Sequence, residues 1–132
     1  MHRTARGDVA QPRPLLVFWH GVGEDGDGTS QLYKVLAYGP PKLIADDVWP
    51  LSRPFIVLSP QHAVPDCPNA AEVHAFITWA IQNYRVDPNR IFLTALSCGA
   101  IGSWDYLGTY TNTQVAAAVL VAGDPGDPAL GS

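Results

Sequence analysis

Long apolar stretches and basic segments are both missing from this sequence of 132 residues. A membrane-spanning helix needs about 18 or more consecutive apolar residues, and no such run occurs. Acidic side chains number 12 and basic ones 8, for a formal net charge of −4, whereas a nucleic-acid-binding protein needs a basic face to contact phosphates. The sequence therefore favours neither a membrane protein nor a nucleic-acid-binding protein.

Cysteine is also scarce, with only Cys67 and Cys98 present. Two cysteines form neither a metal-binding motif nor a disulfide framework, so we expect a reduced environment, no metal and no other cofactor. Residues 1–14 carry arginines but lack the apolar core of a secretory signal. The sequence leaves the compartment unassigned, with the cytoplasm favoured.

The acidic loop 24–29 has the composition of a calcium-binding loop but not its pattern. Counted from Asp25, the sixth position is Ser30 instead of glycine, and the twelfth is Leu36 instead of glutamate. We interpret the loop as a polar turn.

Hydrophobic residues make up 47% of the chain and charged residues 15%, a composition typical of a globular domain. Four apolar runs predict strands that are buried, as in a parallel sheet: residues 14–19, 55–58, 90–96 and 116–121. Helical segments are predicted between them: residues 30–37, 42–46, 69–84 and 99–110.

The alternation of strands and helices predicts an α/β fold, a parallel, doubly wound sheet with flanking helices. We expect residues 1–13 to be a flexible N-terminal segment, 14–123 to form the domain, and 124–132 to be a loose tail. We also expect the tripeptide at residues 87–89 to be a turn, and residues 39–41 to interrupt a helix. In the longest helix, Asn69 is placed to cap the first turn and Glu72 to complete a capping box.

Parallel strands bring their carboxyl ends to one edge of a sheet, where functional residues of such folds lie. Four polar or glycine-containing segments follow the predicted strands: residues 20–23, 59–62, 97–99 and 123–124. We therefore expect the chemistry at this edge.

Ser97 stands between a predicted strand and a predicted helix, with small residues Ala95 and Gly99 two positions away on either side. This is the pattern of a nucleophile elbow, a sharp turn that projects the serine hydroxyl above the sheet. The alternative is that Ser97 only caps the following helix.

Acyl transfer also needs two backbone N–H groups that stabilise the developing oxyanion. The N–H of Cys98, directly after the serine, is one candidate, and that of Val22 in the glycine-containing loop after the first buried strand is the other. Glycines on either side of Val22 let the backbone approach a substrate closely. In an alternative interpretation, Cys98 is a reactive thiol.

Several stretches together resemble α/β-hydrolases, in particular the esterase and predicted-peptidase branch related to polyhydroxybutyrate depolymerases, feruloyl esterases and prolyl-oligopeptidase catalytic domains. The resemblance lies in residues 14–24, 39–44, 56–61, 84–94, 96–99 and 102–105. It implies hydrolysis of small-molecule carboxylic esters through a Ser-His-Asp triad and an acyl-enzyme. Ala95, Cys98 and Ala100 replace the family's usual glycine, methionine and glycine. The family's acid and histidine lie on later strands, which this chain does not contain.

Within the chain, His62 is the candidate general base, because it follows a strand at the active edge. Asp124, after the fourth strand, is the candidate acid, with a simple turn residue as its alternative. The resemblance favours a structural role for His20. Because the strands visible here form the middle of the family's larger sheet, we expect a homo-oligomer or a complementing chain. The alternative function is a catalytically impaired module that binds a ligand or partner.

Overall fold

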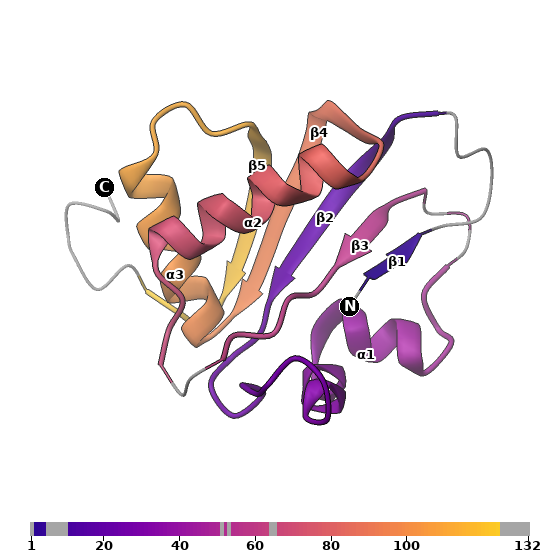
Figure 1. The fold of residues 1–132 in the computed structure, drawn as a ribbon, viewed down its shortest axis with the longest axis vertical. Coiled ribbons are helices and arrows are strands. Elements are labelled where there is room, and N and C mark those ends of the chain that lie inside the picture. Colours follow the sequence, from indigo (N-terminus) through magenta and orange to yellow (C-terminus); the bar gives the residue numbers. More distant parts are fainter. Residues whose placement is uncertain (1, 5–10, 51, 53, 64–65, 125–132) are drawn as a thin grey trace.

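Four parallel strands form the centre of the computed structural model (Figure 1), which describes residues 2–4, 11–50, 52, 54–63 and 66–124. The strands lie in the order β3-β2-β4-β5. Their bounds are Arg13–Trp19 for β2, Ile56–Leu58 for β3, Val86–Leu96 for β4 and Val115–Val121 for β5. The predicted parallel α/β sheet is therefore confirmed, and its carboxyl ends share one edge.

Two local features of the strands differ from the prediction. Within residues 1–13, predicted to be a flexible segment, the described residues His2–Thr4 form strand β1, which pairs antiparallel with β3 because the outer backbone groups of β3 accept a strand there. The expected turn at 87–89 lies inside β4, at the place where the pairing of β2 with β4 shifts register. The Asp87 carboxylate accepts a hydrogen bond from the Asn89 N–H (2.9 Å), so the turn becomes an irregularity within a strand.

The helices form layers on both sides of the sheet (Figure 1). Helices α2 (Ala70–Asn83) and α3 (Cys98–Thr109) cover one face. The 3₁₀ helix η1 (Leu32–Ala37) and helix α1 (Gly39–Ala45) precede β3, and Gly39 lies against the Phe18 ring on the opposite face. Side chains alternate along a strand, so Phe18 faces α1 while Val17 faces α2.

Helix α1 begins where the sequence predicted an interruption. Gly39 adopts a left-handed backbone conformation (φ 69°), and a Cβ at this position would lie 2.7 Å from the Phe18 ring. The two prolines that follow occupy the first turn of α1, where a proline's missing N–H leaves no hydrogen bond unmade. Proline therefore starts this helix instead of breaking it.

Helix α2 follows the predicted apolar stripe, with Val73, Ile77 and Ala80 buried. Asn69 caps the helix, since its side-chain oxygen accepts a hydrogen bond from the Glu72 N–H (2.8 Å). The Glu72 carboxylate instead contacts a histidine ring, so the predicted capping box is replaced by a one-sided cap.

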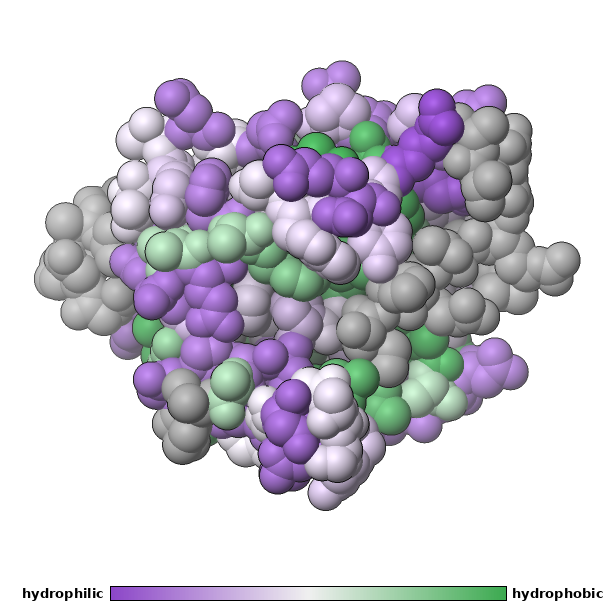
Figure 2. Space-filling view, in the orientation of Figure 1, coloured by the Kyte–Doolittle hydropathy of each residue, from purple (hydrophilic) through white to green (hydrophobic). Residues whose placement is uncertain are grey.

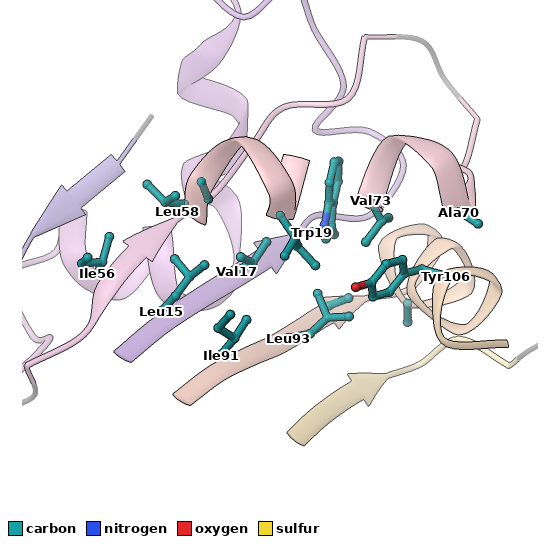
Figure 3. Close-up of a cluster of buried hydrophobic side chains, with 14 residues drawn as sticks. Leu15, Val17, Trp19, Ile56, Leu58, Ala70, Val73, Ile91, Leu93 and Tyr106 are labelled. Atoms are coloured by element: carbon teal, nitrogen blue, oxygen red, sulfur yellow. The ribbon is translucent and has the colours of Figure 1, made fainter. Parts of the chain in front are cut away.

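The core lies between the sheet and the two helices α2 and α3. Figure 3 shows Trp19 and Leu93, from neighbouring strands, meeting Val73 of α2 and Tyr106 of α3. All four side chains are at most 2% exposed. Hydrophilic residues cover most of the face that carries α2, with hydrophobic ones in separate patches (Figure 2). Among the described residues, no helix is long and apolar enough to cross a membrane.

The Asn69 cap predicts a measurable contribution to stability. Replacing Asn69 by alanine leaves the Glu72 N–H without its acceptor, so we expect the free energy of unfolding to fall by about 1 kcal/mol. Urea unfolding monitored by circular dichroism measures this. Asn69→Asp keeps an acceptor oxygen and is the matched control; an equal loss in both variants would contradict the capping role.

Candidate active site

Ser97 stands at the sharp turn between β4 and α3. Its backbone angles are φ 53° and ψ −114°, a conformation that non-glycine residues rarely adopt. The Ser97 N–H donates to the Val121 carbonyl (2.8 Å), which ties the turn to the end of β5. The Ser97 side chain makes no capping hydrogen bond with α3. The geometry has the strand, the strained turn and the helix of a nucleophile elbow, and the helix-cap alternative finds no hydrogen bond to support it.

The start of α3 lies very close to the end of β2, and only glycine fits at Gly99. A Cβ there would overlap the Trp19 carbonyl oxygen and would lie 2.6 Å from that of His20. On the strand side, Ala95 is 1% exposed. The small residues on either side of Ser97 are therefore required by backbone packing.

The loop after β2 passes beside the elbow. A Cβ built on Gly21 would lie 3.4 Å from the Ser97 Cβ, so this loop and the serine are in direct proximity. Val22 is 54% exposed, and within the described residues its N–H donates no hydrogen bond. Cys98 is the first residue of α3, where a backbone N–H has no acceptor inside the helix. Within the described residues, both predicted donors are thus N–H groups without a recorded acceptor; Val22 follows Gly21, which lies beside Ser97, and Cys98 follows Ser97 itself.

His20 is buried, and both of its ring nitrogens are engaged. Nδ1 lies 2.7 Å from the Gly21 carbonyl oxygen, and Nε2 lies 2.8 Å from the His62 backbone N–H. Because the backbone N–H needs an acceptor, Nε2 accepts and Nδ1–H donates. This fixes the neutral tautomer and gives His20 a structural position in the loop.

Glu24 is a buried acid that sequence reasoning did not identify. It is 6% exposed, and a Cβ on Gly21 would lie 3.9 Å from its carboxylate oxygen Oε2. Burial raises the pKa of Glu24, although the hydrogen bond from the Gly21 backbone acts in the opposite direction. Glu24 was visible in the sequence only as part of an acidic loop.

Gln61 holds the polar loop 24–31 in place. Its Nε2 donates to the carbonyl oxygens of Glu24 and Gln31 (both 2.8 Å), and its Oε1 accepts from the Gly28 N–H (2.8 Å). A cavity of about 370 Å³ lies between this loop and the loop after β2, lined by Val22, Gly23, Asp25, Gly26, Gln31, Lys34 and Ala63. Gln61 therefore shapes a cavity that borders Val22.

His62, the predicted base, is 8% exposed and faces two carboxylates. Its Nε2 lies 2.5 Å from an oxygen of Asp66, and its Nδ1 lies 2.8 Å from one of Glu72. Burial alone would lower the pKa of His62, but the hydrogen bonds to Asp66 and Glu72 outweigh it and raise the pKa. Both ring nitrogens of His62 are therefore engaged with carboxylates and not with Ser97.

The other predicted site residue, Asp124, lies just beyond β5 on the same edge of the sheet and is exposed. Its neighbour Gly123 is close to the elbow, since a Cβ there would lie 2.5 Å from the Ser97 carbonyl oxygen. The Gly123 carbonyl accepts a hydrogen bond from the Trp104 indole (3.3 Å). His74, by contrast, stacks on Tyr110 with ring centroids 4.1 Å apart on the helical face.

Cys67 and Cys98 form a disulfide, so the expectation of reduced cysteines is wrong. The two residues are 31 positions apart in the sequence, and the folded chain brings the segment before α2 against the start of α3. The reactive-thiol interpretation of Cys98 is also wrong for this state, because its sulfur is bonded. The cysteine count allowed a pair, but no spacing rule could identify it.

Comparison with known proteins identifies the fold. No protein-family model matches the chain, and no curated protein does. Among solved structures, a thermostable esterase matches with a TM-score of 0.62 and 25% identity, over 91% of this chain and 35% of the esterase. The chain has the fold of an α/β-hydrolase over the part of that fold that it spans.

Two further structures support the same assignment. The thermophilic esterase Est2 of the Planctomycetes species Thermogutta terrifontis matches with a TM-score of 0.58 and 19% identity, over 92% of this chain and 46% of Est2. The alpha/beta hydrolase GrgF from Penicillium sp. sh18 matches with a TM-score of 0.54 and 18% identity, over 87% and 39%. Est2 also matches in a form phosphorylated by paraoxon. The chain spans between a third and a half of the length of these three proteins.

Within the part of the chain that the structure describes, no group of three or more His, Cys, Asp and Glu side chains is arranged to hold a metal ion.

The environment of His62 predicts a pH dependence of stability. The pKa of His62 in the folded protein is raised above the ordinary value of 6.5. Such a histidine contributes its full stabilisation at pH values below 6.5, and this contribution is lost as the pH rises through the folded-state pKa. We therefore expect the free energy of unfolding to fall as the pH rises above about 6.5, the ordinary histidine pKa.

Chemical unfolding at a series of pH values measures this dependence. In His62→Gln the decline above neutral pH should disappear, while His74→Gln, which removes an exposed histidine, should retain it. A decline of the same size in His62→Gln would show that another group causes it.

Proposed function

We propose that this chain is a serine carboxylic ester hydrolase in which Ser97 is the nucleophile. The observation that carries the proposal is the backbone of Ser97, a non-glycine residue with φ 53° at a strand-to-helix turn. Such strain persists where the surrounding structure enforces it, and it concentrates at active sites. The esterases among the structural matches support the same reaction class.

In the proposed reaction, the Ser97 hydroxyl attacks the carbonyl carbon of an ester. The backbone N–H groups of Val22 and Cys98 donate hydrogen bonds to the oxygen that becomes negative. The ester C–O bond breaks, and the alcohol leaves with the proton that the Ser97 hydroxyl gives up. Water then hydrolyses the acyl-enzyme, which releases the carboxylic acid and restores the Ser97 hydroxyl. The start of α3 adds the positive end of a helix dipole beside the same oxygen.

The mechanism also requires a general base. His20 holds the oxyanion loop with both ring nitrogens, and His62 faces two carboxylates. We infer that His62 has a structural role through its contacts with Asp66 and Glu72. To act as a general base, its ring would have to break one of these two contacts. Asp124, at the end of β5, remains the proposed acid, because it lies on the same edge.

The second candidate function is a module that binds a ligand or partner without turnover. The observation that favours it is that, within the described residues, no histidine forms a hydrogen bond with the Ser97 hydroxyl. Such a module would retain the elbow and the oxyanion donors and would bind an ester or its analogue without a burst of acyl-enzyme. Kinetics separate the two functions.

The hydrolase proposal predicts that Ser97→Ala abolishes activity. Loss of the nucleophile should lower the rate of p-nitrophenyl acetate hydrolysis by at least about 100-fold, because only the oxyanion donors remain. Steady-state absorbance of the released nitrophenol measures it. Ser52→Ala, at an exposed serine away from the site, is the control and should keep the full rate. Equal rates in Ser97→Ala and the parent protein would contradict the assignment.

We also propose that β5 pairs with β5 of a second copy. This strand ends the sheet, so its outer backbone N–H and C=O groups can accept another strand. Its sequence, residues 115–121, contains neither charge nor proline, so a two-fold pairing brings no like charges together. Val119 and Val121 are 65% and 50% exposed and would be covered in the pair.

Sedimentation velocity at micromolar concentration tests this association. We expect a dimer that Val119→Lys shifts to monomer, because it places a positive charge on the paired strand of each copy. Val48→Lys, at another exposed valine, should leave the dimer intact. A clean monomer of the parent protein would contradict self-pairing and would favour a separate complementing chain on this edge.

A further inference from the structure

The connection between β3 and α2, residues 59–69, contacts both parts of the proposed oxyanion site. It is described at residues 59–63 and 66–69. At its first end, the His62 N–H donates to the His20 ring (2.8 Å), and the His62 carbonyl accepts from the Gly26 N–H (3.0 Å). Gln61 adds a hydrogen bond to the Glu24 carbonyl (2.8 Å). This end therefore holds the loop that carries Val22.

The other end of the β3–α2 connection is fixed to the start of α3. Cys67 forms the disulfide with Cys98. Pro68 packs so closely on α3 that a Cβ at Gly102 would overlap its carbonyl oxygen. Just beyond the connection, the Ala70 N–H donates to the Asp105 carboxylate (2.8 Å). This end therefore holds the residue that carries the second proposed donor.

One short connection thus joins the Val22 loop to Cys98, and the disulfide is its covalent attachment. We propose that the β3–α2 connection sets the position of the two oxyanion donors relative to each other, with Cys67 and Gln61 as positioning residues. The inference rests on the proposed function, because it assigns a role within that same site. Cys67 touches no reacting atom; it acts through Cys98.

This arrangement makes the site sensitive to reduction. A dithiol such as dithiothreitol would transfer two electrons and two protons to the disulfide, giving the Cys67 and Cys98 thiols, and would itself become a cyclic disulfide. Cys98 would keep its backbone N–H, but it would no longer be covalently attached to the β3–α2 connection. Reduction should therefore slow the reaction step more than it weakens substrate binding.

The test compares Cys67→Ser/Cys98→Ser and Gln61→Ala with the parent protein. The first variant keeps both backbone N–H groups and removes the disulfide, and the second loosens the opposite end of the connection without touching the cysteines. Ile77→Val, in the α2 core, is the control for a general loss of stability. Hydrogen exchange of the amides at residues 20–26 and 98–102 reports positioning whether or not the protein turns over substrate.

For both connection variants we expect faster exchange in these two segments than Ile77→Val shows. For p-nitrophenyl acetate we expect kcat to fall by about 10-fold, less than the 100-fold or more for losing an oxyanion donor, with KM changed by less than about 2-fold. Dithiothreitol should reproduce the double variant, and reoxidation should reverse it.

Three results would overturn the inference. These are exchange unchanged in either segment, exchange that rises evenly over the chain as in Ile77→Val, and faster exchange with an unchanged kcat. Absence of hydrolysis by the parent protein would instead refute the proposed function. The exchange data would then still decide whether the connection positions the Val22 loop and Cys98.

Discussion

The close approach of α3 to the end of β2 constrains everything else at the active edge. Gly99 has room only for a hydrogen beside the Trp19 and His20 carbonyl groups. Because the helix must start this close to the sheet, the chain turns sharply at Ser97 and takes up a strained conformation there. The same approach brings the loop after β2 to within contact distance of the serine, so that the proposed nucleophile and the proposed oxyanion donors occupy one small region.

Strain of this kind costs on the order of 1–3 kcal/mol, and the surrounding contacts offset it. The Ser97 N–H is hydrogen-bonded to the end of β5, and the disulfide from Cys98 closes a loop of 31 residues. By the loop-entropy model, a crosslink of this span stabilises a fold by about 3–4 kcal/mol. The connection before α2 thus both stabilises the turn at Ser97 and ties it to the loop of His20.

Much of this architecture could be predicted from the sequence, because it depends on local patterns. Apolar runs and the stripe of α2 indicated the strands and helices, and the small residues around Ser97 indicated the sharp turn between β4 and α3. The disulfide, the carboxylates around His62 and the burial of Glu24 could not be predicted, because each depends on residues brought together only by folding. Likewise, β1 pairs with β3 because an open sheet edge is nearby, and no pattern within residues 2–4 signals that.

The central claim is that the fold prepares Ser97 as a nucleophile, and a covalent probe tests it most directly. Est2, which shares the fold, is known in a form phosphorylated by paraoxon. After treatment of this protein with paraoxon, peptide mapping by mass spectrometry should locate one diethylphosphoryl group on the peptide that contains Ser97. A modification on another residue, or none under conditions that modify Est2, would contradict the account.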